Sequence, residues 1–256
     1  MTTKETTASR QQGFTLIELS IVLVIIGLVV GGVMVGRTLI QQAEIRAAVT
    51  RIQQFDTAYR TFQTKYGCIA GDCANATDFF GMNYVVEPVG CPPSGGAGNG
   101  NGNGDGVIKA FPGYENSSWQ CETVQAHVSL SMANLLPSKL LSPCSPGNTA
   151  FIQGLNDSCG YFYSDDVYSA VVKSNISSIT FAGYTADFTV RGAALSPVQA
   201  RLIDEKIDDG KPATGRFRGL DAALSSGGGI VANSCQTSGA YNLNENYTCR
   251  ALYYFK

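Results

Sequence analysis

The stretch from Phe14 to Val35 constrains this chain most, because it is apolar throughout and carries only one charge, Glu18. About 20 apolar residues in a helix are enough to cross a bilayer. A carboxylate inside such a span is costly and therefore indicates a functional position. The polar residues 1–13 before it include two cations, which predicts that this end stays on the cytoplasmic side. We expect a leader at 1–13, a transmembrane helix at 14–36 and an exported C-terminal part.

The residues Gly13-Phe14-Thr15-Leu16-Ile17-Glu18, followed by an unbroken hydrophobic helix, resemble the start of type IV pilin precursors and type II secretion pseudopilins. This resemblance implies cleavage between Gly13 and Phe14 by a prepilin peptidase, followed by N-methylation of Phe14. It also implies that Glu18 of one subunit meets the new ammonium group of its neighbour and sets the register of a filament. The implied partners are copies of the chain or other pilins, and the inner-membrane assembly machinery.

An uncleaved signal anchor is the alternative for this segment. An ordinary secretory signal has a shorter apolar core and a small-residue cleavage site after it, and this sequence shows neither. The anchor contains two pairs of glycines at small-xxx-small spacing, which lets helices approach closely in lipid, although glycine is also common in membrane helices. These glycines are Gly27, Gly31, Gly32 and Gly36.

The helix is expected to continue beyond the membrane through residues 37–67. No glycine or proline occurs from Arg37 to Tyr66, and Gly67 is a plausible terminator. Apolar residues recur at steps of three, four or seven, which is typical of one helix face packed on a core. They are Ile45, Ile52, Phe55, Tyr59, Phe62 and Tyr66. The whole helix would be roughly 80 Å long at 1.5 Å per residue.

The remaining residues, 68–256, are enough for one globular head. Short apolar segments between turns rich in Gly, Asn, Ser and Pro predict an antiparallel sheet, so the fold class is α+β. Ser196-Pro197 with Gln199 predicts a capped helix that ends near Asp209-Gly210. A second helix is expected from Glu122 to Leu136, before Pro137. The expected strands are 160–163, 170–173, 178–182, 187–191 and 250–255.

All eight cysteines lie after the anchor, in the part expected to be exported. An even number there predicts disulfides, and zinc is disfavoured because no C-x-x-C pair and only one histidine occur. The sequence does not fix the pairing. We expect neighbours to pair, Cys235 with Cys249 above all, which resembles the C-terminal disulfide loop of many type IV pilins. The cysteines are Cys68, Cys73, Cys91, Cys121, Cys144, Cys159, Cys235 and Cys249.

The Asn/Gly-rich stretch 99–108 is the sharpest site signal in the head. From Asn101 it matches the first half of an EF-hand loop, in which oxygen ligands alternate with other residues and a glycine takes the sixth position. Pro112 stands where that motif has its bidentate Glu, so the carboxylate would come from elsewhere, with Glu115 or Glu122 as candidates. A flexible loop is the alternative. The expected calcium ligands are Asn101, Asn103, Asp105, the carbonyl of Val107, and Glu122.

A wider resemblance to large prepilin-type proteins covers Gly71-Asp72, Asn75-Ala76-Thr77 and Phe79-Phe80-Gly81, with the Asn/Gly loop and Glu122 after them. The resemblance predicts a structural filament subunit and no enzyme. The alternative is a minor or tip pilin that acts as an adhesin with a calcium-ordered loop. The net charge of −2 offers no electrostatic steering toward nucleic acid. The sequence contains no Gly-x-Ser-x-Gly elbow, P-loop or H-E-x-x-H motif.

Overall fold

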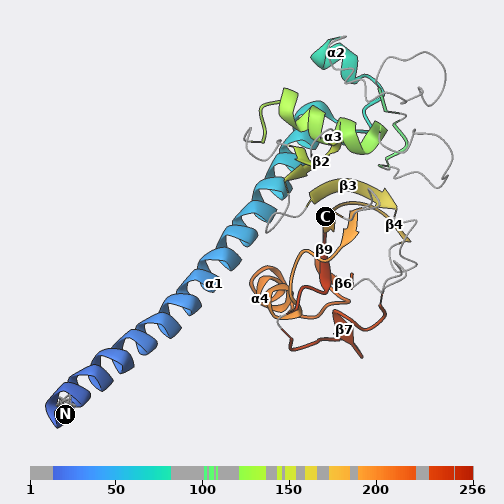
Figure 1. Ribbon diagram of the computed structural model, residues 1–256. Helices are drawn as coiled ribbons and strands as arrows, with labels where there is room; N and C mark the ends of the chain where they lie inside the picture. The colour runs from blue at the N-terminus through green and yellow to red at the C-terminus, as the bar shows by residue number, and fades with distance from the viewer. Residues whose placement is uncertain are drawn as a thin grey trace, which may run out of the picture. The chain divides into compact units, whose positions relative to one another are not determined.

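The structure is a computed structural model. It describes residues 14–81, 101–102, 104–106, 108, 121–136, 143–145, 148–153, 159–165, 173–184, 190–222, 231–244 and 246–255. The chain divides into two compact units, residues 1–44 and 45–256. Helix α1, Leu16–Tyr66, supplies the described helix of the first unit and the first element of the second (Figure 1).

The part of α1 in the second unit carries the predicted apolar stripe. Ile45, Ile52, Phe55, Tyr59 and Phe62 are all buried, at steps that place them on one helix face. The helix ends at Tyr66 because Gly67 adopts a left-handed φ of 71° and donates its N–H to the carbonyl of Gln63 at 2.9 Å. The predicted stripe and terminator are both confirmed.

The head is built on an antiparallel sheet in the order β1-β2-β3-β4-β9-β6, with β5 paired to β4 (Figure 1). The C-terminal strand therefore lies between β4 and β6. A separate small hairpin joins β7 to β8. The bounds are β1 Pro143–Ser145, β2 Asn148–Gln153, β3 Cys159–Asp165, β4 Lys173–Tyr184, β5 Val190–Gly192, β6 Phe217–Asp221, β7 Gln236–Thr237, β8 Ala240–Tyr241 and β9 Cys249–Tyr254.

The strand predictions agree with this sheet where it is described. The segment 160–163 lies in β3, 178–182 in β4, and all but the last residue of 250–255 in β9. The segment 187–191 meets β5 only at its last two residues, and 170–173 meets β4 only at Lys173. The other residues of those two segments lie outside the described chain. The long N-terminal helix with an antiparallel sheet confirms the α+β class.

Helix α4, Pro197–Ile207, begins with the predicted capping box. Ser196 Oγ accepts the N–H of Gln199 at 3.2 Å, and Gln199 Oε1 accepts the N–H of Ser196 at 3.1 Å. These two reciprocal bonds satisfy donors that a helix N-terminus leaves free. The helix ends slightly before the predicted Asp209-Gly210, and Gly210 takes a left-handed φ of 72° just beyond it. Helix α2 is the single short turn Ala76–Phe80.

Helix α3, Cys121–Met132, ends before the predicted Leu136, so that boundary was wrong. Asn134 adopts a left-handed φ of 54°. Its N–H donates to Ser131 O at 2.8 Å, and the N–H of Leu135 donates to Leu130 O at 3.0 Å. This is a Schellman motif with Asn at the position glycine usually takes. The stop therefore comes from Asn134, ahead of Pro137.

The core of the head forms between α1 and the sheet. Phe55 of α1 packs on Phe181 of β4 with ring centroids 5.9 Å apart, and Tyr59 stacks on Phe255 at 4.3 Å. An ion pair lies beside them, in which Arg216 Nη2 donates to Asp56 Oδ1 at 2.6 Å. Aromatic pairs of this kind add to the free energy gained by burial alone.

Candidate functional site

The N-terminus of α1 is closed by Thr15 and Glu18. Glu18 Oε2 accepts the backbone N–H and the hydroxyl of Thr15, each at 2.8 Å, and Thr15 Oγ1 accepts the N–H of Glu18 at 3.3 Å. This is a reciprocal capping box, and a carboxylate at a helix N-terminus is also favoured by the helix dipole. This second role of Glu18 was not predicted, although the T-x-x-E spacing signals it. Phe14 is 87% exposed, and Gly13 lies outside the described residues.

The first part of α1 exposes its apolar side chains. Among the described residues, α1 is the one helix long and apolar enough to cross a membrane by length and composition. Its most apolar window has a mean hydropathy of 2.8, and none of that window is buried within the chain. Within the described part of the chain, the four glycines of this segment likewise face open space, because a methyl group added at any of them would meet nothing within 4 Å.

The candidate calcium loop is organised around Asp72, which the sequence analysis had noted only within the wider resemblance. The N–H of Gly104 donates to Asp72 Oδ1 at 2.8 Å, and the N–H of Gly106 donates to Asp72 Oδ2 at 2.7 Å. Asp72 is 2% exposed. Burial raises the pKa of its carboxyl group, while the N–H donors of the loop act in the opposite direction.

The expected calcium ligands lie in different settings. Asn101 Oδ1 accepts the N–H of Thr77 at 2.9 Å, and Asn101 Nδ2 donates to Thr77 Oγ1 at 3.1 Å. Asp105 is exposed, while Asn103 and Val107 lie outside the described residues. A calcium site with this ligand set stays a prediction.

Glu122, the fifth expected ligand, is 8% exposed in the first turn of α3. Its backbone lies close to the segment that carries Asp72, because a methyl group added at Gly71 would stand 2.4 Å from the carbonyl oxygen of Glu122. The fold therefore packs the start of α3 against Gly71. Gly71 directly precedes Asp72, whose carboxylate accepts the hydrogen bonds of the Asn/Gly loop.

Two of the expected neighbour disulfides are confirmed. Cys68 pairs with Cys73, and Cys235 pairs with Cys249. Closing a loop of about 15 residues, as the second bond does, stabilises a fold by about 3 kcal/mol in the chain-entropy treatment. The side chains of Cys91, Cys121, Cys144 and Cys159 lie outside the described residues.

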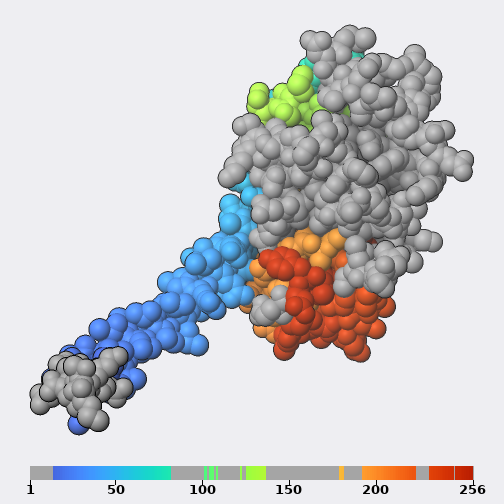
Figure 2. Space-filling model, in the orientation of Figure 1, coloured from blue at the N-terminus to red at the C-terminus, as the bar shows by residue number. Residues whose placement is uncertain are grey.

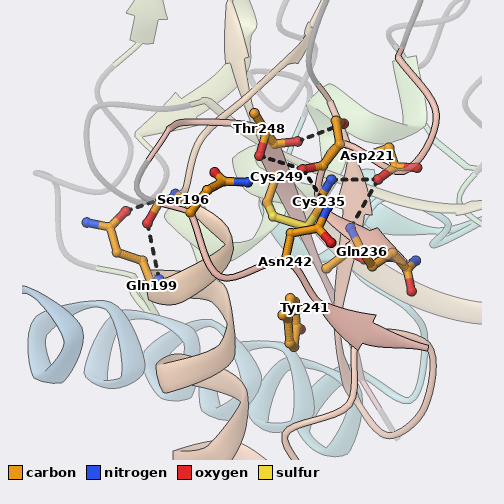
Figure 3. The surroundings of a disulfide bond; sticks show 12 residues. Ser196, Gln199, Asp221, Cys235, Gln236, Tyr241, Asn242, Thr248 and Cys249 are labelled. Carbon is orange, nitrogen blue, oxygen red and sulfur yellow. Dashed lines mark hydrogen bonds between the residues drawn. A yellow bond between two sulfur atoms is a disulfide. The ribbon is translucent and has the colours of Figure 1, made fainter. Parts of the chain in front are cut away.

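A hydrogen-bond network holds the C-terminal disulfide loop (Figure 3). Asp221, at the end of β6, accepts the N–H of Asn233 at 2.9 Å and the N–H of Cys235 at 2.7 Å. Asn242 donates to the carbonyls of Asn233 and Ser234 at 2.8 and 3.2 Å. The described residues of this C-terminal segment, coloured red, reach the molecular surface in Figure 2, and Leu243 and Tyr247 are 73% and 55% exposed.

Three carboxylates gather at the end of α4. Asp204, Asp208 and Asp209 each offer an oxygen within 4.8 Å of the others, so by spacing they could hold a metal ion. Each already accepts protein hydrogen bonds. Tyr241 donates its hydroxyl to Asp204 at 2.8 Å, Phe217 donates its N–H to Asp208 at 2.9 Å, and the Thr214 hydroxyl donates to Asp209.

The comparison with protein families agrees with the N-terminal geometry. Residues 8–34 match the family described as the prokaryotic N-terminal methylation motif. The matched segment contains Thr15, Glu18 and most of the exposed apolar part of α1. No curated protein and no solved structure matches the chain.

Proposed function

Because residues 8–34 carry the signature of type IV pilins and pseudopilins, we propose that this chain is a structural subunit of a type IV pilus or pilus-like secretion filament. The observation that carries the proposal is the combination of that motif with the exposed apolar first part of α1, residues 16–35, whose only charge is Glu18. The motif belongs to a structural protein family, and it implies processing by prepilin peptidase and assembly into filaments.

Processing would occur between Gly13 and Phe14, with N-methylation of Phe14. The helix begins at Leu16 with Thr15 as its cap, so the bond to be cleaved lies just outside the first helical turn. Removal of residues 1–13 leaves the capping box complete, because its groups all belong to Thr15 and Glu18. The precursor is anchored in the membrane by α1, and we place the head in the periplasm before assembly.

Glu18 would set the register by binding the ammonium group of Phe14 on a neighbouring copy. Both hydrogen bonds that Glu18 accepts end on Oε2, so within the described part of the chain Oε1 remains able to accept another donor. A carboxylate in apolar surroundings gains most from an opposite charge, since Coulomb attraction is strong at low dielectric constant. One side chain can therefore cap its own helix and bind the next subunit.

The glycines of the membrane segment support close approach of a neighbouring helix. Gly27 and Gly31, like Gly32 and Gly36, are four residues apart and therefore lie on one helix face. Among the described residues, and apart from the backbone of α1 itself, nothing lies within 4 Å of the position that a Cβ atom would take at these glycines. Packing among the described residues therefore does not require glycine there, whereas close contact between membrane helices favours small residues.

A Glu18→Gln variant separates the two roles of Glu18. Glutamine at this position keeps a capping box, so α1 should insert and be cleaved normally, but it removes the charge. We expect the variant to accumulate in the inner membrane in processed form and to be lost from sheared filaments, as measured by immunoblotting. Glu44→Gln, which removes an exposed charge from the same helix, is the matched control and should assemble normally. Normal filament content of Glu18→Gln would refute the register role.

A minor or tip subunit that binds a surface is the second candidate. The exposed Leu243 and Tyr247 of the C-terminal disulfide loop favour it, because they place apolar surface on the outside of the head. Stoichiometry distinguishes the two roles. A structural major subunit is present in every repeat of the fibre, whereas a tip adhesin is present in one or a few copies, as quantitative mass spectrometry of purified filaments would show.

A further inference from the structure

We propose that the carboxylate of Asp72, by accepting backbone hydrogen bonds from the Asn/Gly loop, holds this loop in its folded conformation without a bound cation. The loop comprises residues 101–106, of which Asn103 is not described. This proposal goes beyond filament assembly and concerns the head alone.

Backbone N–H groups of the loop donate four hydrogen bonds to Asp72 and Cys73. Gly104 donates to Asp72 Oδ1 at 2.8 Å and to the backbone carbonyl of Asp72 at 3.1 Å. Gly106 donates to Asp72 Oδ2 at 2.7 Å, and Gly102 donates to the carbonyl of Cys73 at 2.9 Å. Both carboxylate oxygens are therefore engaged by the loop. Hydrogen bonds to an ionised acceptor are roughly twice as strong as those between neutral groups.

The glycines of the loop are explained by this arrangement. Gly104 and Gly106 adopt left-handed φ values of 72° and 84°, which L side chains rarely take. Alternation of such residues turns successive N–H groups inward, which forms the concave anion site called a nest. A methyl group added at Gly102 would lie 2.4 Å from backbone atoms of Asp72, so only glycine permits this close approach.

Asp72 itself is held firmly. It lies in the ring closed by the Cys68–Cys73 disulfide, and its own N–H donates to the carbonyl of Ile69 at 3.0 Å. Gly71, the preceding residue, packs directly against the first turns of α3 at Glu122 and Ala126. Asp72 is thus held by contacts that do not involve the loop, so ordering the loop does not also require ordering Asp72.

The electrostatics of the loop follow from this geometry. A buried carboxylate is costly unless hydrogen-bond donors surround it, and the donors here come from the backbone of the loop. The N–H groups of the loop in turn point at the carboxylate of Asp72. The carboxylate and the loop therefore stabilise each other, and we expect the loop to stay ordered at low calcium concentration.

The test is amide hydrogen exchange of the full-length, oxidised protein in detergent, measured for peptides that cover residues 101–106. The same measurement is made with EDTA and with calcium chloride. In the wild type we expect slow exchange at Gly104 and Gly106 in both conditions. In Asp72→Asn, the amide NH₂ faces one of the two donors, so exchange at these residues should accelerate roughly 10-fold or more. Asp78→Asn, the same change on the exposed surface of α2, is the control and should exchange like the wild type.

Two outcomes would overturn the proposal. The first is a wild-type loop that exchanges rapidly in EDTA and slowly with calcium, because a cation would then order it. The second is an Asp72→Asn loop as protected as the wild type. If Asp72→Asn does not fold, Gly106→Ala provides the second variant, since it leaves Asp72 in place and meets no atom within 4 Å. Alanine there opposes the left-handed φ, so exchange at Gly104 should still accelerate, and unchanged exchange would refute the nest.

Discussion

At the scale of single residues, Asp204 has the clearest energetic consequence. It is fully buried in α4, and this burial raises the pKa of its carboxyl group from 3.8 to about 7. The hydrogen bond from Tyr241 lowers that pKa, and the charges of Asp208 and Asp209 raise it further. Between pH 3.8 and about pH 7, the carboxyl group of Asp204 is therefore protonated in the native state and ionised in the unfolded chain. By linkage, the free energy of unfolding must fall as the pH rises through this window.

We predict that the contribution of Asp204 to the free energy of unfolding falls as the pH rises from about 4 to about 7, with a slope of at most about 1.4 kcal/mol per pH unit. Urea unfolding of the full chain in detergent at a series of pH values measures this slope. Asp204→Asn imitates the protonated group and should flatten the profile, while the exposed Glu205→Gln on the same helix should leave it unchanged. A profile of Asp204→Asn as steep as that of the wild type would contradict the assignment.

The residue-scale predictions from sequence succeeded where a local pattern carried the information. The pairing of Cys235 with Cys249 was predicted from their proximity in the chain and is confirmed, whereas the register role of Glu18 stays a prediction. The role of Asp72 could not be predicted, because its donors are backbone N–H groups of Gly104 and Gly106, more than thirty residues away. Asp221 is a similar case. A carboxylate that binds distant main-chain groups leaves no side-chain pattern to recognise.

At the scale of elements, the contact of α1 with the sheet depends on Arg216 as well as on apolar packing. Arg216 donates to Asp56 at 2.6 Å and to the carbonyl of Tyr254 at 3.3 Å, and it lies 4.8 Å from the ring centroid of Tyr253. The two charged side chains are 33% and 19% exposed, so the pair is partly shielded from water. Arg60 also donates to Asp56 from the next turn of α1.

We predict a coupling free energy of about 1–2 kcal/mol between Asp56 and Arg216, intermediate between exposed and buried ion pairs. A double-mutant cycle with Asp56→Asn and Arg216→Gln, followed by urea unfolding, isolates this term from the other contacts of each residue. The exposed pair of Arg201 and Glu205 on α4 is the matched control and should give no more than about 0.5 kcal/mol. Equal coupling in the two pairs would show that the ion pair of Asp56 with Arg216 stabilises the contact between α1 and the sheet no more than an exposed pair does.

The boundaries of α3 and α4 show which helix ends the local sequence can predict. The start of α4 was predictable because the capping box is encoded within four residues, Ser196 to Gln199. The end of α3 was not, because an Asn at φ 54° costs conformational free energy that tertiary packing must offset. Leu135 and Leu136, just after it, pack against the core. The helix therefore ends where the chain must turn inward, ahead of the proline that sequence rules favoured.

At the scale of the whole molecule, the sheet of the head depends on the C-terminal strand β9. The strand β9 lies between β4 and β6, with Thr180 of β4 opposite Leu252 and Gly219 of β6 opposite Ala251. The apolar pattern predicted this strand, but its central position could not be predicted, because the pairing joins segments distant in sequence. Such non-local contacts slow folding, because the entropy of loop closure is lost before the contacts compensate for it. The disulfide from Cys249 to Cys235 fixes the beginning of the same strand.

The processed state of the protein provides the last prediction. If α1 acts as the filament helix, the mature chain should begin at Phe14 with one added methyl group. The cysteines should be oxidised in the exported head, since two pairs already join in the described structure and the total number is even. An intact-mass spectrum of unreduced protein from sheared filaments or native membranes tests both expectations, with reduced protein as the control for the disulfides. A mature mass that retains residues 1–13 would identify α1 as an uncleaved anchor and remove the basis for a filament.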